Sequence, residues 1–114
     1  MSKLKSEDRK IKCVIWDLDN TIWNGTLLED QTVILRPNIT EIIRTLDERG
    51  ILQSICNRNS YEQVFEKLRE FKLAEYFIYS QVNWSPKSES IAAIAKAINI
   101  GTDTLAFIDD QQFE

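Results

Sequence analysis

The chain has 114 residues, of which 14 are lysine or arginine and 18 are aspartate or glutamate, so its formal net charge is −4. This length allows one domain with one core, and the acidic balance argues against a nucleic-acid binder. The absence of histidine excludes imidazole-dependent triads and histidine metal sites, and the two cysteines match no zinc pattern. The sequence shows no secretory signal and no apolar run long enough to span a membrane, so we expect a cytoplasmic protein.

The first residues are charged, and the rest of the chain has the pattern of a folded core. Residues 1–10 are interpreted as a basic, solvated leader and residues 11–114 as one core domain. Residues 11–17 form a short apolar run that ends in an aspartate, which is typical of a strand buried between helices. Asn24-Gly25, flanked by apolar residues that include Leu27 and Leu28, then predicts a β-hairpin at about residues 22–34.

Three helices and three further strands alternate along the rest of the chain. Apolar residues at helical spacing predict helices from Pro37 to Gly50, from Ser60 with a capping box to Gln63, and from Ser85-Pro86 to Gly101. The expected buried positions of these helices are Ile39, Ile42, Ile43 and Leu46, then Tyr61, Val64, Leu68 and Phe71, then Ile91, Ile94, Ala95 and Ile98. Short β-type runs occur at 51–56, 77–80 and 105–108. This order predicts an α/β fold, a Rossmann-like parallel sheet between helices.

Polar side chains follow each predicted strand, and the carboxyl ends of parallel strands meet at one edge of a sheet. Asp17 and Asp19 follow the first strand, and Asp109 and Asp110 follow the last. If these strands are neighbours, the carboxylates converge, and two of them about 5 Å apart repel by about 3 kcal/mol at an effective dielectric near 20. A hard divalent cation relieves this repulsion, and oxygen ligands with retained water suit Mg²⁺. The alternative is that these acids are ordinary turn residues.

The spacing assigns roles to the residues at this edge. Asp17 is the first residue beyond its strand, where a carboxylate is able to bind Mg²⁺ and to attack phosphorus, which gives an aspartyl phosphate. Asp19 is placed to act as general acid and then base, because the chain has no histidine. Lys87 at a helix start is a candidate for holding a transferred phosphoryl group, and the Asn57 amide for binding phosphate. A solvated lysine and a plain turn residue are the alternatives.

The segment Asp17-Leu18-Asp19-Asn20-Thr21 resembles the first motif, DxDx(T/V), of the haloacid dehalogenase (HAD) superfamily. Lys87 matches the third motif and Asp109-Asp110 the fourth, so the resemblance spans residues 12–114. Four segments resemble sequences of the FkbH-like branch, HAD phosphatase subfamily IIIC. They are DLDNTIWNG, SICNRN, NWSPKSESI and FIDDQQFE. The resemblance implies a magnesium site formed by Asp17, Asp109 and the backbone carbonyl of Asp19, with Asp110 as a further candidate ligand.

The FkbH-like branch contains phosphatase-like enzymes of polyketide assembly lines. They are associated with taking a glyceryl unit from 1,3-bisphosphoglycerate, releasing phosphate and loading the acyl group on an acyl carrier protein. The acyl-accepting cysteine of the branch matches Cys56, and the residues expected to bind the phosphorylated substrate are Thr21, Asn57, Arg58 and Lys87. Two alternatives remain: a plain Mg²⁺-dependent phosphatase in which Cys56 only packs in the core, and a non-catalytic module that binds metal, phosphate or a partner protein.

Several features depart from the family pattern or bear on access to the site. Asn57 stands where the pattern has serine, and Gln111-Gln112 stand where it has Asn-Pro. The hairpin at 22–34 takes the place of a flap and is too short for a cap domain, which leaves the site open to a large substrate. The fifth strand of the superfamily core is expected to be missing, which would expose the edge of the fourth. Trp23 and Trp84 either line the opening or pack as partly buried residues.

Overall fold

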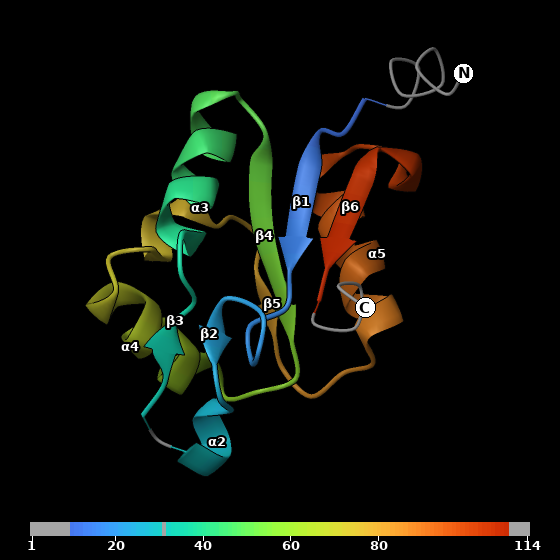
Figure 1. The fold of residues 1–114 in the computed structure, drawn as a ribbon. Coiled ribbons are helices and arrows are strands. Elements are labelled where there is room, and N and C mark those ends of the chain that lie inside the picture. Colours follow the sequence, from blue (N-terminus) through green and yellow to red (C-terminus); the bar gives the residue numbers. More distant parts are fainter. Residues whose placement is uncertain (1–9, 31, 110–114) are drawn as a thin grey trace.

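A parallel sheet forms the centre of the fold in the computed structural model, which describes residues 10–30 and 32–109 (Figure 1). Its strands are β1 (Cys13–Trp16), β4 (Leu52–Asn57), β5 (Gln81–Val82) and β6 (Leu105–Ile108). They lie in the order β5-β4-β1-β6, and every pairing between them is parallel. The predicted α/β fold is confirmed, and the carboxyl ends of the strands meet at one edge of the sheet.

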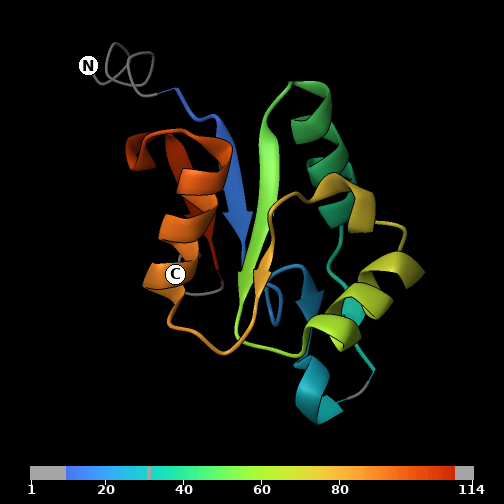
Figure 2. The ribbon, with the colours of Figure 1, turned by 180° about the vertical axis from the view of Figure 1, so that it is seen from behind.

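β1 lies inside the sheet because both of its faces are apolar. Alternate residues of a strand point to opposite faces. Val14 and Trp16 pack in the larger core cluster, which α3 (Ile39–Glu48) and α4 (Tyr61–Glu70) also line. Cys13 and Ile15 pack in a second cluster with residues of α5 (Lys87–Ile98). Figures 1 and 2 show the two layers, with α3 and α4 on one side of the sheet and α5 on the other.

The helices begin and end close to the predicted residues. The Ser60 hydroxyl accepts a hydrogen bond from the Gln63 backbone N–H at 3.5 Å, which is one of the two bonds of the predicted capping box. The Ser60 backbone N–H donates to the Asn59 side chain instead of to Gln63. Gly50 follows α3 with a φ of +79°, a conformation that suits glycine at the end of a helix. α5 starts at Lys87 after Pro86, and it ends at Ile98 and not near Gly101, because Asn99 already has the left-handed conformation that stops a helix.

Three predictions about individual segments are wrong. The strand expected at 77–80 lies instead at Gln81–Val82 and is β5. A 3₁₀ helix, η1 (Ala74–Tyr76), precedes it, and the φ of +50° at Tyr79 is not that of an extended residue. Tyr61 was expected to be buried but is 55% exposed, because it is the first residue of α4 and stacks on Phe65 at 4.5 Å. Ile42 is 46% exposed, because only Ile39 and Ile43 of that stripe face the core fully.

The hairpin after β1 spans about the predicted residues, but a short helix and not a tight turn joins its two strands. β2 (Trp23–Asn24) pairs antiparallel with β3 (Ile34–Leu35), and a short helix α2 (Leu27–Asp30) lies between them. Asn24-Gly25 therefore leads into a helix and not into a second strand that contains Leu27 and Leu28. The Asp30 carboxylate accepts a hydrogen bond from the Thr26 backbone N–H at 2.8 Å, which closes this turn of helix. We call residues 22–35 the flap; Gln31 lies outside the described residues.

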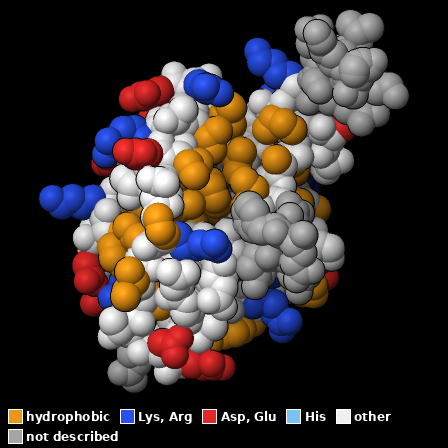
Figure 3. Space-filling view, in the orientation of Figure 1, with side chains coloured by type: hydrophobic (Ala, Val, Ile, Leu, Met, Phe, Trp, Pro, Cys, Tyr) orange, Lys and Arg blue, Asp and Glu red, His pale blue; other side chains and the backbone are white. Residues whose placement is uncertain are grey.

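Part of the sheet face beside α3 carries no helix from the described residues. Figure 3 shows hydrophobic side chains gathered there, over the strands. A cavity of about 260 Å³ opens on this side, and its lining residues are Trp16, Thr21, Arg36, Pro37, Ile39, Ile42 and Ile108. The predicted leader, residues 1–9, and the residues after Asp109 lie outside the described part of the chain. Within the described part, no helix is long and apolar enough to cross a membrane.

Gln53 is a buried polar residue that ties β4 to its neighbours in both layers. Its side-chain oxygen accepts a hydrogen bond from the Trp16 indole N–H of β1 at 2.9 Å. Its amide nitrogen donates to the Ile43 carbonyl of α3, also at 2.9 Å. Because a buried amide is costly unless both ends are paired, these bonds favour one placement of α3 on the sheet.

Replacing Gln53 with leucine should lower the free energy of unfolding by about 1–3 kcal/mol, because the Trp16 N–H would then lack an acceptor in the core. Urea unfolding followed by circular dichroism measures this loss. Arg44→Leu, on the exposed side of α3, is the control and should change stability by less than about 0.5 kcal/mol. Equal losses in the two variants would contradict the proposed role of Gln53.

Candidate active site

The carboxyl ends of β1, β4 and β6 bring several of the predicted site residues to one edge of the sheet. Asp17 follows β1, and its backbone N–H donates to the Ile108 carbonyl of β6 at 2.9 Å. Trp16 pairs with Ile108, so Asp109 leaves β6 beside the point where Asp17 leaves β1. Asn57 is the last residue of β4, and Lys87 is the first residue of α5. The expected convergence of the two strand ends is therefore present.

The Asp17 carboxylate lies between an amide and an ammonium group. The Asn57 side-chain nitrogen donates to Oδ1 of Asp17 at 3.2 Å, and Nζ of Lys87 lies 3.7 Å from Oδ2. The Asp17 side chain is 13% exposed and that of Lys87 is 40% exposed. Nζ of Lys87 also lies 5.5 Å from the centre of the Phe107 ring, a contact that favours this position of the ammonium group. An anion that approaches Asp17 would meet both donors.

Asp19 has a separate set of contacts, with the flap and the start of α4. Its Oδ1 accepts hydrogen bonds from the Trp23 indole N–H at 2.9 Å and from the Leu27 backbone N–H at 3.1 Å. The Asn59 side-chain nitrogen lies 3.5 Å from Oδ2. The Asn59 oxygen in turn accepts a hydrogen bond from the Ser60 backbone N–H at the N-terminus of α4. Asp19 thus links the flap to the loop after β4.

These contacts of Asp19 leave almost no signal in the sequence. Asn59 is the third polar residue after a strand, and that position was the only signal it carried. Leu27 contributes only its backbone N–H, which no side-chain pattern reveals. Trp23 is fully buried, so of its two predicted roles the structure supports packing, whereas Trp84 is 58% exposed in the loop before α5.

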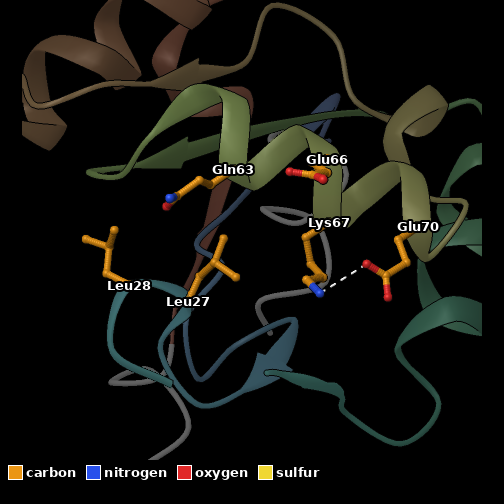
Figure 4. A pocket seen from close by; sticks show the side chains of 6 residues that line it. All are labelled: Leu27, Leu28, Gln63, Glu66, Lys67 and Glu70. Carbon is orange, nitrogen blue, oxygen red and sulfur yellow. Dashed lines mark hydrogen bonds and ion pairs between the residues drawn. The ribbon is translucent and has the colours of Figure 1, made fainter. Parts of the chain in front are cut away.

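A groove separates the flap from α4 (Figure 4). Its volume is about 300 Å³, and its lining residues are Leu27 and Leu28 of α2 with Gln63, Glu66, Lys67 and Glu70 of α4. Nζ of Lys67 lies 3.1 Å from the Glu70 carboxylate, and Leu28 is half exposed. Because the Leu27 backbone N–H binds Asp19, the groove adjoins the predicted general acid and base.

The oxygen donors of the predicted magnesium site are the carboxylates of Asp17 and Asp109 and the carbonyl of Asp19. Asp110 lies outside the described residues. In the described part of the chain, no group of three or more histidine, cysteine or acidic side chains is placed to hold a metal ion. Two carboxylates nevertheless fit Mg²⁺, which keeps several waters and is bound in proteins through one or two carboxylates and substrate phosphate.

Two predicted substrate-binding residues are less directly placed. Thr21 is buried on the side of the sheet that faces α3, and its hydroxyl has no hydrogen-bond partner within residues 10–30 and 32–109. Arg58 is exposed in the loop after β4, and the described residues give it no hydrogen bond or ion pair. Of the four predicted substrate-binding residues, only Asn57 and Lys87 are held toward Asp17 by a described contact.

Both cysteines are buried thiols. Burial raises the pKa of the Cys13 thiol, inside β1, to about 11. Burial also raises the pKa of the Cys56 thiol; the Asp17 charge adds to this rise, while the Lys87 charge and a hydrogen bond with Ser90 oppose it. The Cys56 side chain is 1% exposed and its thiol donates to the Lys87 carbonyl at 3.8 Å. Cys56 therefore lies next to the Asp17–Lys87 pair as a protonated, enclosed group.

The chain matches no protein-family profile and no curated protein, but it is similar to solved structures. One is the N-terminal part of the protein BF1531 from Bacteroides fragilis, which contains a phosphatase domain complexed with Mg. It is 29% identical with a TM-score of 0.81, and the match covers 94% of this chain and 32% of that chain.

Two further structures match at lower identity. The 3-deoxy-D-manno-octulosonate 8-phosphate phosphatase from Moraxella catarrhalis, in complex with magnesium, phosphate and KDO, is 17% identical with a TM-score of 0.71, over 96% of this chain and 63% of that chain. A HAD superfamily (subfamily III A) structure from Legionella pneumophila is 19% identical with a TM-score of 0.74, over 96% of this chain and 60% of that chain.

These likenesses show that the chain has the phosphatase-like fold of the HAD superfamily. The chain spans about a third of the length of the Bacteroides chain and less than two thirds of the other two. None of the three structures is named as a member of the FkbH-like branch.

Neither thiol should react with an aromatic disulfide reagent in the native protein at about pH 8, because the thiolate is the reactive form and burial keeps both groups protonated and enclosed. The same assay in urea should detect both cysteines. The release of the coloured thiol product measures the reaction, and Cys13→Ala and Cys56→Ala assign each signal. A native thiol that reacts as fast as in urea would contradict this description of the site.

Proposed function

We propose that this domain hydrolyses phosphate esters by Mg²⁺-dependent transfer of the phosphoryl group to Asp17. The observation that carries the proposal is the Asp17 carboxylate at the end of a buried central strand, with the Asn57 amide and the Lys87 ammonium on its two oxygens. The likeness to the Mg-bound phosphatase domain of Bacteroides fragilis supports it.

In the first step an oxygen of Asp17 attacks phosphorus and forms an aspartyl phosphate, while the bond from phosphorus to the ester oxygen breaks. Asp19 gives a proton to the departing oxygen, which leaves as an alcohol. Lys87 and Asn57 hold the phosphoryl oxygens, where negative charge is concentrated in the transition state.

In the second step a water molecule attacks the phosphorus atom of the aspartyl phosphate, and Asp19 takes the proton that the water loses. The bond from phosphorus to the Asp17 oxygen breaks, inorganic phosphate leaves, and both aspartates return to their starting forms. Asp17, Asp109 and the Asp19 carbonyl would hold Mg²⁺, which would supply positive charge to neutralise the phosphoryl oxygens.

The narrower hypothesis, glyceryl transfer from 1,3-bisphosphoglycerate to an acyl carrier protein, needs Cys56 to accept an acyl group. A thiolate is the nucleophile in such a reaction. Because burial encloses Cys56 and raises its pKa, we favour hydrolysis at Asp17 with Cys56 as part of the second core cluster.

Asp17→Asn should abolish Mg²⁺-dependent phosphate release, because an amide oxygen does not displace an ester oxygen from phosphorus. The circular dichroism spectrum should stay unchanged. Asp47→Asn, on the exposed side of α3, is the matched control and should retain the wild-type rate. Phosphate release by Asp17→Asn at that rate would contradict the assignment of the nucleophile.

Thermal unfolding tests the metal site without reference to activity. At a Mg²⁺ concentration a hundredfold above its Kd, the ion should stabilise the wild type by about 2.7 kcal/mol. This stabilisation should be smaller in Asp109→Asn and unchanged in Asp47→Asn. Stabilisation of the wild type by Mg²⁺ without release of phosphate from any ester would instead support the non-catalytic alternative.

Cys56→Ala should retain phosphate release. Intact-protein mass spectrometry of the wild type, after incubation with Mg²⁺ and 1,3-bisphosphoglycerate, should show no glyceryl adduct. Cys13→Ala is the matched control, because its thiol is equally buried. A glyceryl adduct that is lost in Cys56→Ala and kept in Cys13→Ala would establish acyl transfer and overturn our preference for plain hydrolysis.

A further inference from the structure

The two oxygens of Asp19 are held unequally. Oδ1 accepts two hydrogen bonds, from the Trp23 indole at 2.9 Å and the Leu27 backbone at 3.1 Å, whereas Oδ2 has only the 3.5 Å contact with Asn59 among the described residues. Typical N–H···O distances are about 2.7–3.2 Å, so the bonds to Oδ1 are of ordinary strength and the contact to Oδ2 is weak. Oδ1 is therefore the anchored atom, and Oδ2 is the less constrained one.

We propose that Trp23 is a positioning residue, whose indole N–H holds Oδ1 of Asp19 so that Oδ2 faces the reacting oxygen. This inference rests on the hydrolysis proposed above and concerns the same site. Trp23 does not touch the substrate in this arrangement. It acts through Asp19, because its hydrogen bond restricts rotation of the carboxylate. The carboxylate is therefore already oriented when the reaction begins.

The indole is well suited to this role because it cannot turn away. Trp23 is fully buried in the larger core cluster, and its ring lies 6.2 Å from that of Phe71 in a tilted arrangement. The backbone of Trp23 pairs with Leu35 across the flap. An indole N–H is only a donor, so in a close-packed core its direction is set by the packing of the ring. The donor is therefore in place before any ligand binds.

The flap contributes two donors to the site. Two of its residues, Trp23 and Leu27, deliver N–H groups to the same carboxylate oxygen from opposite ends of the Asn24-Gly25 turn. That turn is held by the Asn20 side chain, which accepts a hydrogen bond from the Gly25 N–H at 2.9 Å. The orientation of the proton donor is consequently set by the flap, whereas that of the nucleophile is set by the sheet.

A comparison of two leaving groups separates positioning of Asp19 from a general loss of structure. An alkyl phosphate needs a proton on its departing oxygen, whereas p-nitrophenolate departs without one. The value of kcat/KM reports the steps up to the departure of that group. A misdirected Asp19 should therefore slow the alkyl ester more than the aryl ester, while partial unfolding should slow both equally.

The experiment compares Trp23→Phe with Trp16→Phe, in the presence of Mg²⁺, on glycerol phosphate and p-nitrophenyl phosphate. Trp16 is the matched control, because it is buried in the same cluster and its indole N–H also makes a 2.9 Å bond, to Gln53. General acid catalysis contributes about 10²–10⁴-fold, so loss of orientation in Trp23→Phe should lower the alkyl-to-aryl ratio of kcat/KM by about tenfold or more. Trp16→Phe should leave the ratio unchanged.

Equal losses on the two esters in Trp23→Phe, or equal ratios in the two variants, would overturn the role of Trp23 and leave the proposed function standing. A wild type that hydrolyses neither ester would overturn the proposed function and this inference with it. If Trp23→Phe does not fold, 3-benzothienylalanine at position 23 keeps the shape of the ring and removes only the N–H. The same fall in the ratio is expected, and an unchanged ratio would again overturn the inference.

Discussion

The burial of β1 on both faces is the constraint on which the rest of the structure depends. Helices cover the strand from both sides, and β1 itself carries no charged side chain before its end. The first such group is Asp17, and the parallel pairing of β1 with β4 and β6 brings Asn57 and Asp109 to the same edge. The cost of burying polar groups within the strand therefore concentrates the chemistry at its end.

The two aspartates of the first motif are held by different parts of the molecule. Asp17 is positioned by the sheet and by the first residue of α5, which are packed on the second core cluster. Asp19 is positioned by the flap and by the loop that begins α4. In the mechanism proposed above, the nucleophile is therefore held by the sheet and the proton donor by the flap.

Most of the fold was predictable because its signals are local. The run that forms β1, the N-cap of α4 at Ser60 and the strand at 105–108 each depend on neighbouring residues, and all three are confirmed. The errors lie where tertiary contacts outweigh local preference. Asn24-Gly25 favours a tight hairpin, yet the bonds of Leu27 to Asp19 and of Asp30 to Thr26 form a helix there. The position of β5 likewise depends on its pairing with the end of β4.

The sequence by itself determined the α/β fold, the central strand and the set of acidic and basic residues at the strand ends. The spacing of apolar residues and the polar residues that follow a strand can both be read in short segments of the chain. Only the tertiary structure decided which of those residues meet. It placed Asn57 and Lys87 on Asp17, buried Cys56, and turned the indole of Trp23 onto Asp19. These contacts join residues from different elements, and their geometry follows from how those elements pack.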